Sequence, residues 1–425
     1  MYSLQAPLFD FETFTHLDAT NRLRLVLETL DLDAFLAHQD VRHRWVGRHG
    51  YGAATLWACL VAGMVYRIPT VAELRRHLQV SAELRWLCGL TRADRVPSAA
   101  TFSRFLALLA AHPEALEAAF QDLVQRFAVA APDFGQQVAV DSTDIHAAAN
   151  GRRAQPADPD ARWGVKGAPG GKKDEKYRWF GYKLHLAVDT RYELPLAFSI
   201  TPANAADSTQ AIPLLEQRDQ RLADAHALGS GASSVAPALK LALFDAAYDS
   251  SAIYRAVLDR GGMPLIPLHK PSAEKSVGIT NGLGTPICPA GLPFTFWGRD
   301  GAYLKYRCPH YAQPNRLCCL KEHRAVSRCS TSPYGQVVKI TIGQDPRRHL
   351  PVPRESPRWL ALYAQRTSVE RVNSRLKDRC LVDDLQVRGL PKVTVRLTLG
   401  LLLMLAAAVA MAERQRWKDI RRLAA

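Results

Sequence analysis

Residues 363–377 read Tyr-Ala-Gln-Arg-Thr-Ser-Val-Glu-Arg-Val-Asn-Ser-Arg-Leu-Lys, and this is the most informative stretch of the chain. At about 100° per residue in an α-helix, four side chains fall within an arc of roughly 60°: Tyr363, Arg366, Glu370 and Lys377. A separate arc is apolar, as the core-facing stripe of a helix should be: Leu362, Val369, Val372 and Leu376. One face therefore presents a carboxylate with two cations and a phenol, which suits a metal-bound phosphate. A surface helix with scattered charges is the alternative while the segment is considered alone.

Two aspartates follow short apolar runs upstream of this helix. Asp141 follows residues 137–140, Gln-Val-Ala-Val, and Asp245 follows residues 240–244, Lys-Leu-Ala-Leu-Phe. Short apolar runs bounded by polar turns predict buried strands, and functional groups gather at the carboxyl ends of parallel strands. A turn or capping role is the alternative for either aspartate alone. Since a hard divalent cation needs several oxygen ligands, the two aspartates and Glu370 together predict a site for metal-assisted phosphodiester chemistry.

With these blocks the chain resembles the DDE transposases of bacterial insertion sequences, in the group with a Tyr-(2)-Arg-(3)-Glu-(6)-Lys signature. The spacing from Tyr363 to Lys377 matches that signature at every position. The second-aspartate block differs at one point, because Ala247 stands where the family usually has glycine. Further blocks also resemble the family: residues 87–90, 96–105, 180–185 (Phe-Gly-Tyr-Lys-Leu-His) and 201–208 (Thr-Pro-Ala-Asn-Ala-Ala-Asp-Ser).

The resemblance implies an α/β fold with an RNase H-like catalytic core built on a mixed sheet. An all-α N-terminal domain for DNA binding and end recognition is expected over residues 1–130. The catalytic core is expected over residues 131–269 and 355–425. A cysteine-containing insertion over residues 270–354 would interrupt this core before the third acidic residue.

The resemblance further implies a transposase that cuts the ends of a mobile element and joins them to target DNA. Asp141, Asp245 and Glu370 would be the catalytic residues and would hold two Mg²⁺ (or Mn²⁺) ions. DNA phosphates would bind Tyr363, Arg366, Lys377 and Lys183. The expected partners are the terminal inverted repeats and target DNA, bound by a homodimer in a synaptic complex. Two alternatives stay open: a domesticated transposase-derived DNA-binding protein, and a structure-specific nuclease without strand transfer.

Composition agrees with a globular DNA-binding protein of 425 residues. The formal net charge is +15 and 48% of residues are hydrophobic, which favours a polyanionic partner. Basic charge alone fits a ribosomal or membrane-surface protein as well. Residues 51–66 and 397–412 are uncharged runs of 16 residues each, shorter than the roughly 20 that span a bilayer, so core helices and no membrane span are expected. The first residues resemble no export signal, so a cytoplasmic, nucleoid-associated protein is expected.

Five of the eight cysteines lie between Cys288 and Cys329. Clustered cysteines in a cytosolic chain bind metal more often than they form disulfides. One interpretation is a structural Zn²⁺ site with Cys288, Cys308, Cys318 and Cys329 as ligands, or with His310 replacing one of them. The spacing lacks paired Cys-x-x-Cys motifs, so reduced thiols are the other interpretation.

Local signals predict several element boundaries. Helices are expected at residues 71–78, after Ser81, and at 98–110, where Arg104 is the exposed candidate for a DNA groove. A helical packing domain is the alternative for this region. Residues 163–179, rich in cations and aromatics, are expected to form a flexible loop before a strand at 183–188. Arg371 and Arg375 lie off the signature face and are expected to be solvated.

Overall fold

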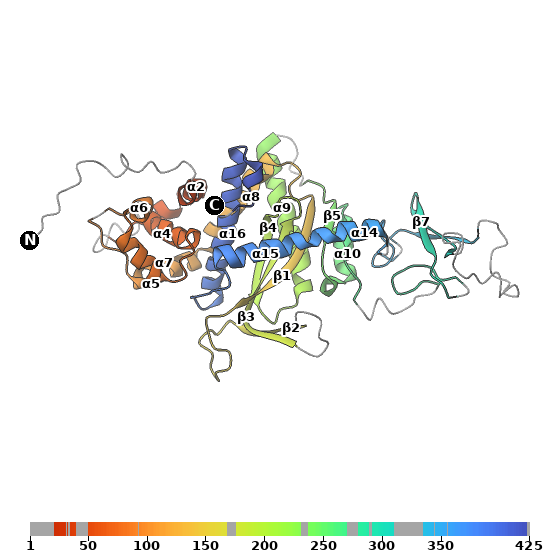
Figure 1. Cartoon of the computed structure of the whole chain (residues 1–425), viewed down its shortest axis with the longest axis horizontal. Coiled ribbons are helices and arrows are strands. Elements are labelled where there is room, and N and C mark those ends of the chain that lie inside the picture. The colour runs from red at the N-terminus through yellow and green to blue at the C-terminus, as the bar shows by residue number, and fades with distance from the viewer. Residues whose placement is uncertain are drawn as a thin grey trace, which may run out of the picture.

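The computed structural model describes residues 21–30, 32, 35–39, 50–91, 93–167, 176–230, 237–269, 279–288, 291–309, 335–343, 345–354 and 356–422. The described N-terminal part is helical. It contains α2 (Arg22–Thr29), α4 (Ala53–Val65), α5 (Val71–Val80), α6 (Ala82–Leu87), α7 (Ala99–Ala111) and α8 (Pro113–Ala130). Figure 1 shows α4 to α7 grouped at one end of an elongated molecule, whereas α8 lies beside α16 (Leu390–Glu413) and α9 (Ala211–Ser230) next to the central sheet.

Hydroxyl caps start three of these helices, as the sequence predicts. Thr70 accepts the Glu73 N–H at 3.1 Å, and Ser81 accepts the Leu84 N–H at 3.1 Å. Ser98 caps α7 in the same way, and Arg104 lies exposed on that helix. Each cap satisfies a backbone donor that the first helical turn leaves without a partner.

The central sheet joins six strands of the described chain. They are β1 (Gln137–His146), β2 (Arg162–Gly167), β3 (Lys176–Asp189), β4 (Pro195–Pro202), β5 (Leu241–Leu243) and β6 (Met263–Leu265). β3 is antiparallel to β1, β2 and β4, whereas β5 runs parallel to β1 and β6 parallel to β5. The helices α9 (Ala211–Ser230) and α10 (Ser251–Asp259) connect the later strands. This mixed sheet confirms the predicted α/β class with an RNase H-like core.

Two sequence-based boundaries are wrong. β1 does not stop at Val140 but runs through Asp141 to His146, because β3 continues to pair with it as far as Gly181. Only the first part of β1 pairs with β5, up to Ala139. Asp141 therefore lies just past the parallel part of the sheet, inside a longer strand. The expected loop at 163–179 is instead a pair of strands, since β2 pairs with the start of β3; residues 168–175 lie outside the described chain.

The family-like block at residues 180–185 contains a glycine, Gly181, that the pairing of β1 with β3 requires. A Cβ at this position would lie 2.1 Å from the Ile145 carbonyl oxygen and 2.8 Å from the Ala147 nitrogen. Real Cβ atoms do not approach backbone this closely, so β1 and β3 pair here only because residue 181 lacks a side chain.

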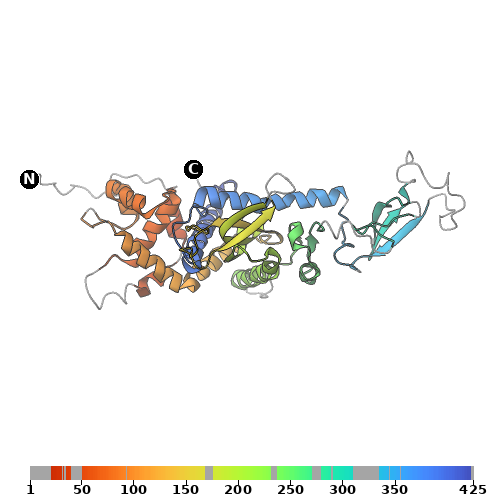
Figure 2. The ribbon, with the colours of Figure 1, turned by 90° about the horizontal axis from the view of Figure 1, so that it is seen from below.

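The signature segment forms a nearly continuous helical rod along one face of the sheet (Figures 1 and 2). It consists of α14 (Pro357–Tyr363), the 3₁₀ turn η3 (Ala364–Arg366) and α15 (Thr367–Cys380). The predicted apolar stripe is confirmed: Val369, Val372 and Leu376 are fully buried, and Leu362 packs against the same core. α15 lies against β1, β3 and the long helix α16 (Leu390–Glu413).

α16 is the core helix that the apolar run at 397–412 predicts. By length and composition α16 could cross a membrane, because an 18-residue stretch of it has a mean hydropathy of 2.1. However, 94% of that stretch is buried inside the structure. It packs against α2, α7, α8 and α15. The run at 51–66 forms the shorter buried helix α4.

The region predicted as an insertion carries a sheet of its own. β7 (Thr295–Asp300), β8 (Tyr303–Arg307) and β9 (Val337–Thr341) pair antiparallel around a small core that includes Cys288 and Cys308. This sheet lies at the opposite end of the molecule from the helical region (Figures 1 and 2). Arg347 donates to Asp249 at 2.6 and 3.0 Å, and so ties the end of this region to the catalytic core.

The zinc interpretation stays a prediction. Cys288 and Cys308 are buried, but His310, Cys318 and Cys329 lie outside the described residues. Within the described ranges, no three His, Cys, Asp or Glu side chains form a group that could hold a metal ion.

Candidate active site

Asp141 is partly buried on β1, just past the point where the parallel pairing ends. Burial raises its pKa to about 6, and the negative charge of Asp245 raises it too. Its own carboxylate accepts the Ser142 N–H at 2.8 Å. The charge of Asp245 acts on Asp141, although 104 positions separate the two aspartates in sequence (245 − 141).

Asp245 follows β5 and caps the short 3₁₀ turn η2 (Ala246–Tyr248). Its carboxylate accepts the Ala247 N–H at 2.8 Å, so the alanine at the usual glycine position fits this turn. Burial raises the pKa of Asp245, and Asp207 contributes to the rise, while the Arg366 charge lowers it.

Arg366 connects the third acidic residue to the first. Its Nη1 lies 3.1 Å from Asp141 Oδ2, and its Nη2 donates to Glu370 Oε1 one helical turn further along. The Glu370 side chain is 50% exposed, against 20% for both Asp141 and Arg366. The structure thus brings Arg366 and Glu370 of the signature helix next to Asp141 on β1, and Asp245 follows the neighbouring strand β5.

The ligand type of the three acidic residues suits a hard divalent cation, but in this conformation no three His, Cys, Asp or Glu side chains of the described chain, these included, form a group that could hold one ion. All three acidic residues offer carboxylate oxygens, the ligands that Mg²⁺ and Mn²⁺ prefer. Burial raises the pKa of both Asp141 and Asp245, and a neighbouring carboxylate adds to each rise; a bound cation would favour the ionised forms. The guanidinium of Arg366 supplies part of that positive charge in this conformation.

Tyr363 lies at the end of α14 beside this site. Its ring stacks on Trp359 with 4.6 Å between centroids and 14° between planes. The Arg366 guanidinium lies 6.0 Å from the Tyr363 ring centroid. Burial raises the pKa of the phenol, so it stays protonated and able to donate a hydrogen bond at neutral pH.

Lys377 is held by a carboxylate that sequence reasoning missed. Its Nζ lies 3.8 Å from Asp144 and 3.5 Å from Asp383. Asp144 also accepts from Lys166 Nζ at 3.0 Å and from the Tyr177 hydroxyl at 3.1 Å. Burial alone would raise the pKa of Asp144, but the lysine charges lower it to about 2. The sequence pattern that could have indicated Asp144 is the second carboxylate of Asp-Ser-Thr-Asp, three positions after Asp141.

Lys183 is buried rather than open to solvent. Its Nζ donates to Asp207 Oδ1 at 2.8 Å and to the Ala205 carbonyl at 2.8 Å. The adjacent His185 is fully buried, bonds Thr201 at 2.8 Å, and has its pKa lowered by burial to about 4. The two family-like blocks at 180–185 and 201–208 therefore pack on each other, and the role of Lys183 at phosphates stays a prediction.

Arg371 and Arg375 are not simply solvated. Arg371 Nε lies 2.7 Å from Glu193 Oε1, and Arg375 donates to the Glu193 carbonyl. Arg421 Nη1 lies 3.3 Å from the same buried carboxylate. Glu193 stands in the turn between β3 and β4, so it ties α15 to the sheet.

Two protein-family models match the chain. The family model described as "Transposase DDE domain" matches residues 132–406, and that described as "Transposase domain (DUF772)" matches residues 11–108. These are domains of transposases, enzymes of mobile DNA elements. Because the first match spans more than half of its length, this chain belongs to the DDE transposase domain family.

No curated protein matches the chain. Among solved structures, it is similar to a cryo-EM structure of piggyBac transposase in a synaptic complex with hairpin DNA. The identity is 10% and the TM-score 0.42, with 94% of this chain and 78% of that chain covered.

Proposed function

We propose that this transposase cuts the ends of an insertion sequence and joins them to target DNA, by phosphodiester hydrolysis followed by transesterification. The observation that carries the proposal is the contact of Arg366 with both Asp141 and Glu370. This contact supports the proposal, because a single arginine side chain links the third acidic residue of the signature to the first aspartate. The DDE transposase family supplies the class of reaction.

Asp141, Asp245 and Glu370 would hold two Mg²⁺ or Mn²⁺ ions. Bound there, the ions would activate the attacking oxygen and stabilise the leaving oxygen. The high pKa of Asp141, about 6, still leaves this carboxylate ionised above neutral pH and able to serve as a ligand.

The chain's own cations and phenol would position the DNA. On binding, Arg366 would exchange its carboxylate partners for a phosphate, which a guanidinium binds with two parallel hydrogen bonds. Lys377, held by Asp144 and Asp383, would place a second charge on the same helical face. The protonated Tyr363 hydroxyl would donate a further hydrogen bond, and Lys183 would contribute only by leaving Asp207.

The proposed partners are the element's inverted terminal repeats and the target DNA. Pairing two ends favours a homodimer in the complex with DNA. A cytoplasmic, nucleoid-associated location follows from such partners.

A cleavage and joining assay tests the proposal. The substrate is a labelled duplex that carries the inverted repeat flanking the gene, supplied with a target plasmid and Mg²⁺ or Mn²⁺. Glu370→Gln and Asp141→Asn should each raise the activation free energy of cleavage by about 3 kcal/mol or more, which lowers the cleavage rate about a hundredfold or more. Glu216→Gln, which changes an exposed carboxylate on α9, is the matched control and should cleave as the wild type does.

The alternatives give different results in the same assay. Cleavage without any joined product would identify a nuclease that lacks strand transfer. Binding of the end without cleavage would identify a DNA-binding derivative. Full activity of the Glu370→Gln and Asp141→Asn variants would show that the proposed site is wrong.

A further inference from the structure

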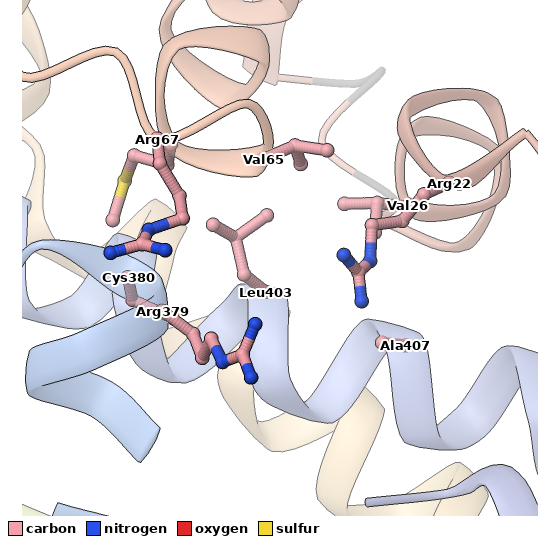
Figure 3. Close-up of a pocket in the computed structure, with 9 residues that line it drawn as sticks. Arg22, Val26, Val65, Arg67, Arg379, Cys380, Leu403 and Ala407 are labelled. Atoms are coloured by element: carbon pink, nitrogen blue, oxygen red, sulfur yellow. The ribbon is translucent and has the colours of Figure 1, made fainter. Parts of the chain in front are cut away.

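A small pocket lies where the helical region meets the catalytic core. It forms between α2, the end of α4, the end of α15 and the middle of α16, and has a volume of about 30 Å³. Three arginines from three of these elements line it: Arg22, Arg67 and Arg379. Figure 3 shows their guanidinium groups arranged around the Leu403 side chain of α16. The other described lining residues are apolar side chains and Cys380.

The positive charge of this pocket is not neutralised by the described residues. None of the residues that line it in the described chain is acidic. Arg22 donates to the Arg422 carbonyl at 3.3 Å, which is a neutral acceptor. Burial lowers the pKa of Arg22, and the positive charge of Arg379 acts in the same direction. Arg22 is partly buried, whereas Arg67 and Arg379 are exposed, so an anion from solvent can reach the group and would offset its positive charge.

The backbone at Arg67 is a second, independent observation. This residue follows the C-cap of α4 with a φ of +55°, in the left-handed region. Helices commonly end on such a residue, and glycine is the usual choice because a side chain there costs about 1–2 kcal/mol. The chain instead places an arginine at this point, with its side chain in the pocket. Strained backbone of this kind is typical of positions that serve binding.

We propose that this pocket binds one phosphate group of a DNA backbone that spans the helical region and the catalytic core. The inference rests on the proposed function and adds a binding site to it. A volume of about 30 Å³ is enough for about two water-sized groups, which matches the two non-bridging oxygens of one backbone phosphate with the rest of the group at the pocket mouth. Guanidinium groups bind phosphate through paired hydrogen bonds, and the apolar walls strengthen that attraction by excluding water.

The pocket is distinct from the scissile-phosphate site. Arg379 follows Glu370 by nine positions on the same helix, which is about 13 Å along the axis and about 180° around it. DNA at the pocket is therefore a different segment from the strand at the carboxylates. Its position between α2, α4 and the core suits DNA that the helical region also contacts.

The test measures DNA affinity against salt concentration with the element-end duplex. A bound phosphate contributes about 0.9 to the slope of log K against log salt. In the double variant Arg67→Gln/Arg379→Gln, the slope of log K against log salt should be shallower by about 0.9. Its DNA affinity near 0.1 M salt should be about five- to tenfold lower than that of the wild type. Arg255→Gln, which removes an exposed arginine on α10, is the matched control and should keep the wild-type slope.

Thermal unfolding separates binding from a structural role. Since the variant removes charge repulsion and no described ion pair, its Tm without DNA should equal or exceed that of the wild type. A lower Tm with an unchanged salt slope would assign the arginines to folding and overturn the inference.

Titration with inorganic phosphate is a second experiment. If free phosphate raises the wild-type Tm through these arginines while the DNA slope is unaffected, the pocket binds the free anion and not DNA. A wild-type protein that does not bind DNA at all would overturn the proposed function together with this site.

Discussion

Replacing Arg366 with glutamine is expected to strengthen divalent-cation binding and, at the same time, to weaken DNA cleavage. In the structure, Arg366 occupies the carboxylates that the ions would need: Nη1 lies 3.1 Å from Asp141, and Nη2 donates to Glu370. A cation must therefore displace the guanidinium before it binds both carboxylates. The variant removes this competition, but it also removes a proposed phosphate ligand.

The size of the effect follows from the ion pair. Unit charges about 4 Å apart attract by about 4 kcal/mol at an effective dielectric constant near 20. Asp141 and Arg366 are both 20% exposed, so solvent screening and desolvation reduce the net value to about 1–2 kcal/mol. Removing this term should raise the apparent affinity for Mn²⁺ about five- to thirtyfold.

The assay follows the Tm of the DNA-free protein during titration with Mn²⁺, because a ligand that binds only the folded state raises the Tm. The measurement is made near pH 8. The pKa of Asp141 is already about 6, and loss of the Arg366 charge raises it further, so a lower pH would protonate the ligand. Arg371→Gln removes an equal charge from the opposite side of α15 and should change Mn²⁺ affinity less than twofold. Asp141→Asn should abolish most of the response.

An Arg366→Gln variant that binds Mn²⁺ no better than the wild type would refute this reasoning. It would mean that the guanidinium and the cation do not compete, and that the three carboxylates do not form one metal site. If Arg366→Gln bound Mn²⁺ more tightly and also cleaved DNA faster than the wild type, Arg366 would not be a phosphate ligand.

Three further changes have defined outcomes. Asp144→Asn should cost about 2 kcal/mol of unfolding free energy at pH 7, because the pKa of Asp144 is about 2 in the folded chain and about 3.9 when unfolded. That contribution is complete above about pH 4 and is lost as the pH falls toward 2, so urea denaturation at pH 3 should show about half the difference. Gly181→Ala should destabilise by at least about 2 kcal/mol, since its Cβ would meet the Ile145 oxygen at 2.1 Å; Gly50→Ala, with open space around it, is the control for urea denaturation. Glu193→Gln should lower the free energy of unfolding, measured by thermal unfolding, by about 1–3 kcal/mol, because the buried Glu193 carboxylate pairs with three arginines, of which Arg375 is the least exposed. It should also lower cleavage, since α15 loses its contact with the turn before β4.

The core of the site was predictable because its residues obey strong local rules. Asp141 and Asp245 both follow runs of apolar side chains that had to be buried strands, and Glu370 lies on a helix with a clear apolar stripe. Those rules fix which end of the sheet and which face of the helix carry the acids. They do not fix how the side chains pair. The contact between Arg366 and Asp141 depends on the 3₁₀ turn η3, which has no distinct sequence pattern.

The errors have the same physical origin. Ser142 and Thr143 are buried on β1 although they are polar, so the apolar pattern stopped at Val140 while the strand continued. On β2, Trp163 and Val165 are 44% and 52% exposed. A strand that exposes its apolar residues and forms by pairing with a neighbour gives no burial pattern to read. Asp144 was missed because its partners lie on β2 and α15, far away in sequence.

α15 shows how one helix can link two proposed DNA contacts. Its acidic and basic signature residues, Glu370 and Lys377, share one side, while arginines at positions 371, 375 and 379 line another. Glu193 accounts for the first two of these arginines and leaves Arg379 at the pocket. Buried residues along α15 hold it against β1, β3 and α16. With a phosphate bound at Arg379 as proposed, one packed helix would carry both that DNA contact and the Glu370 carboxylate, so the separation of the two along the DNA would be set by the length of this helix.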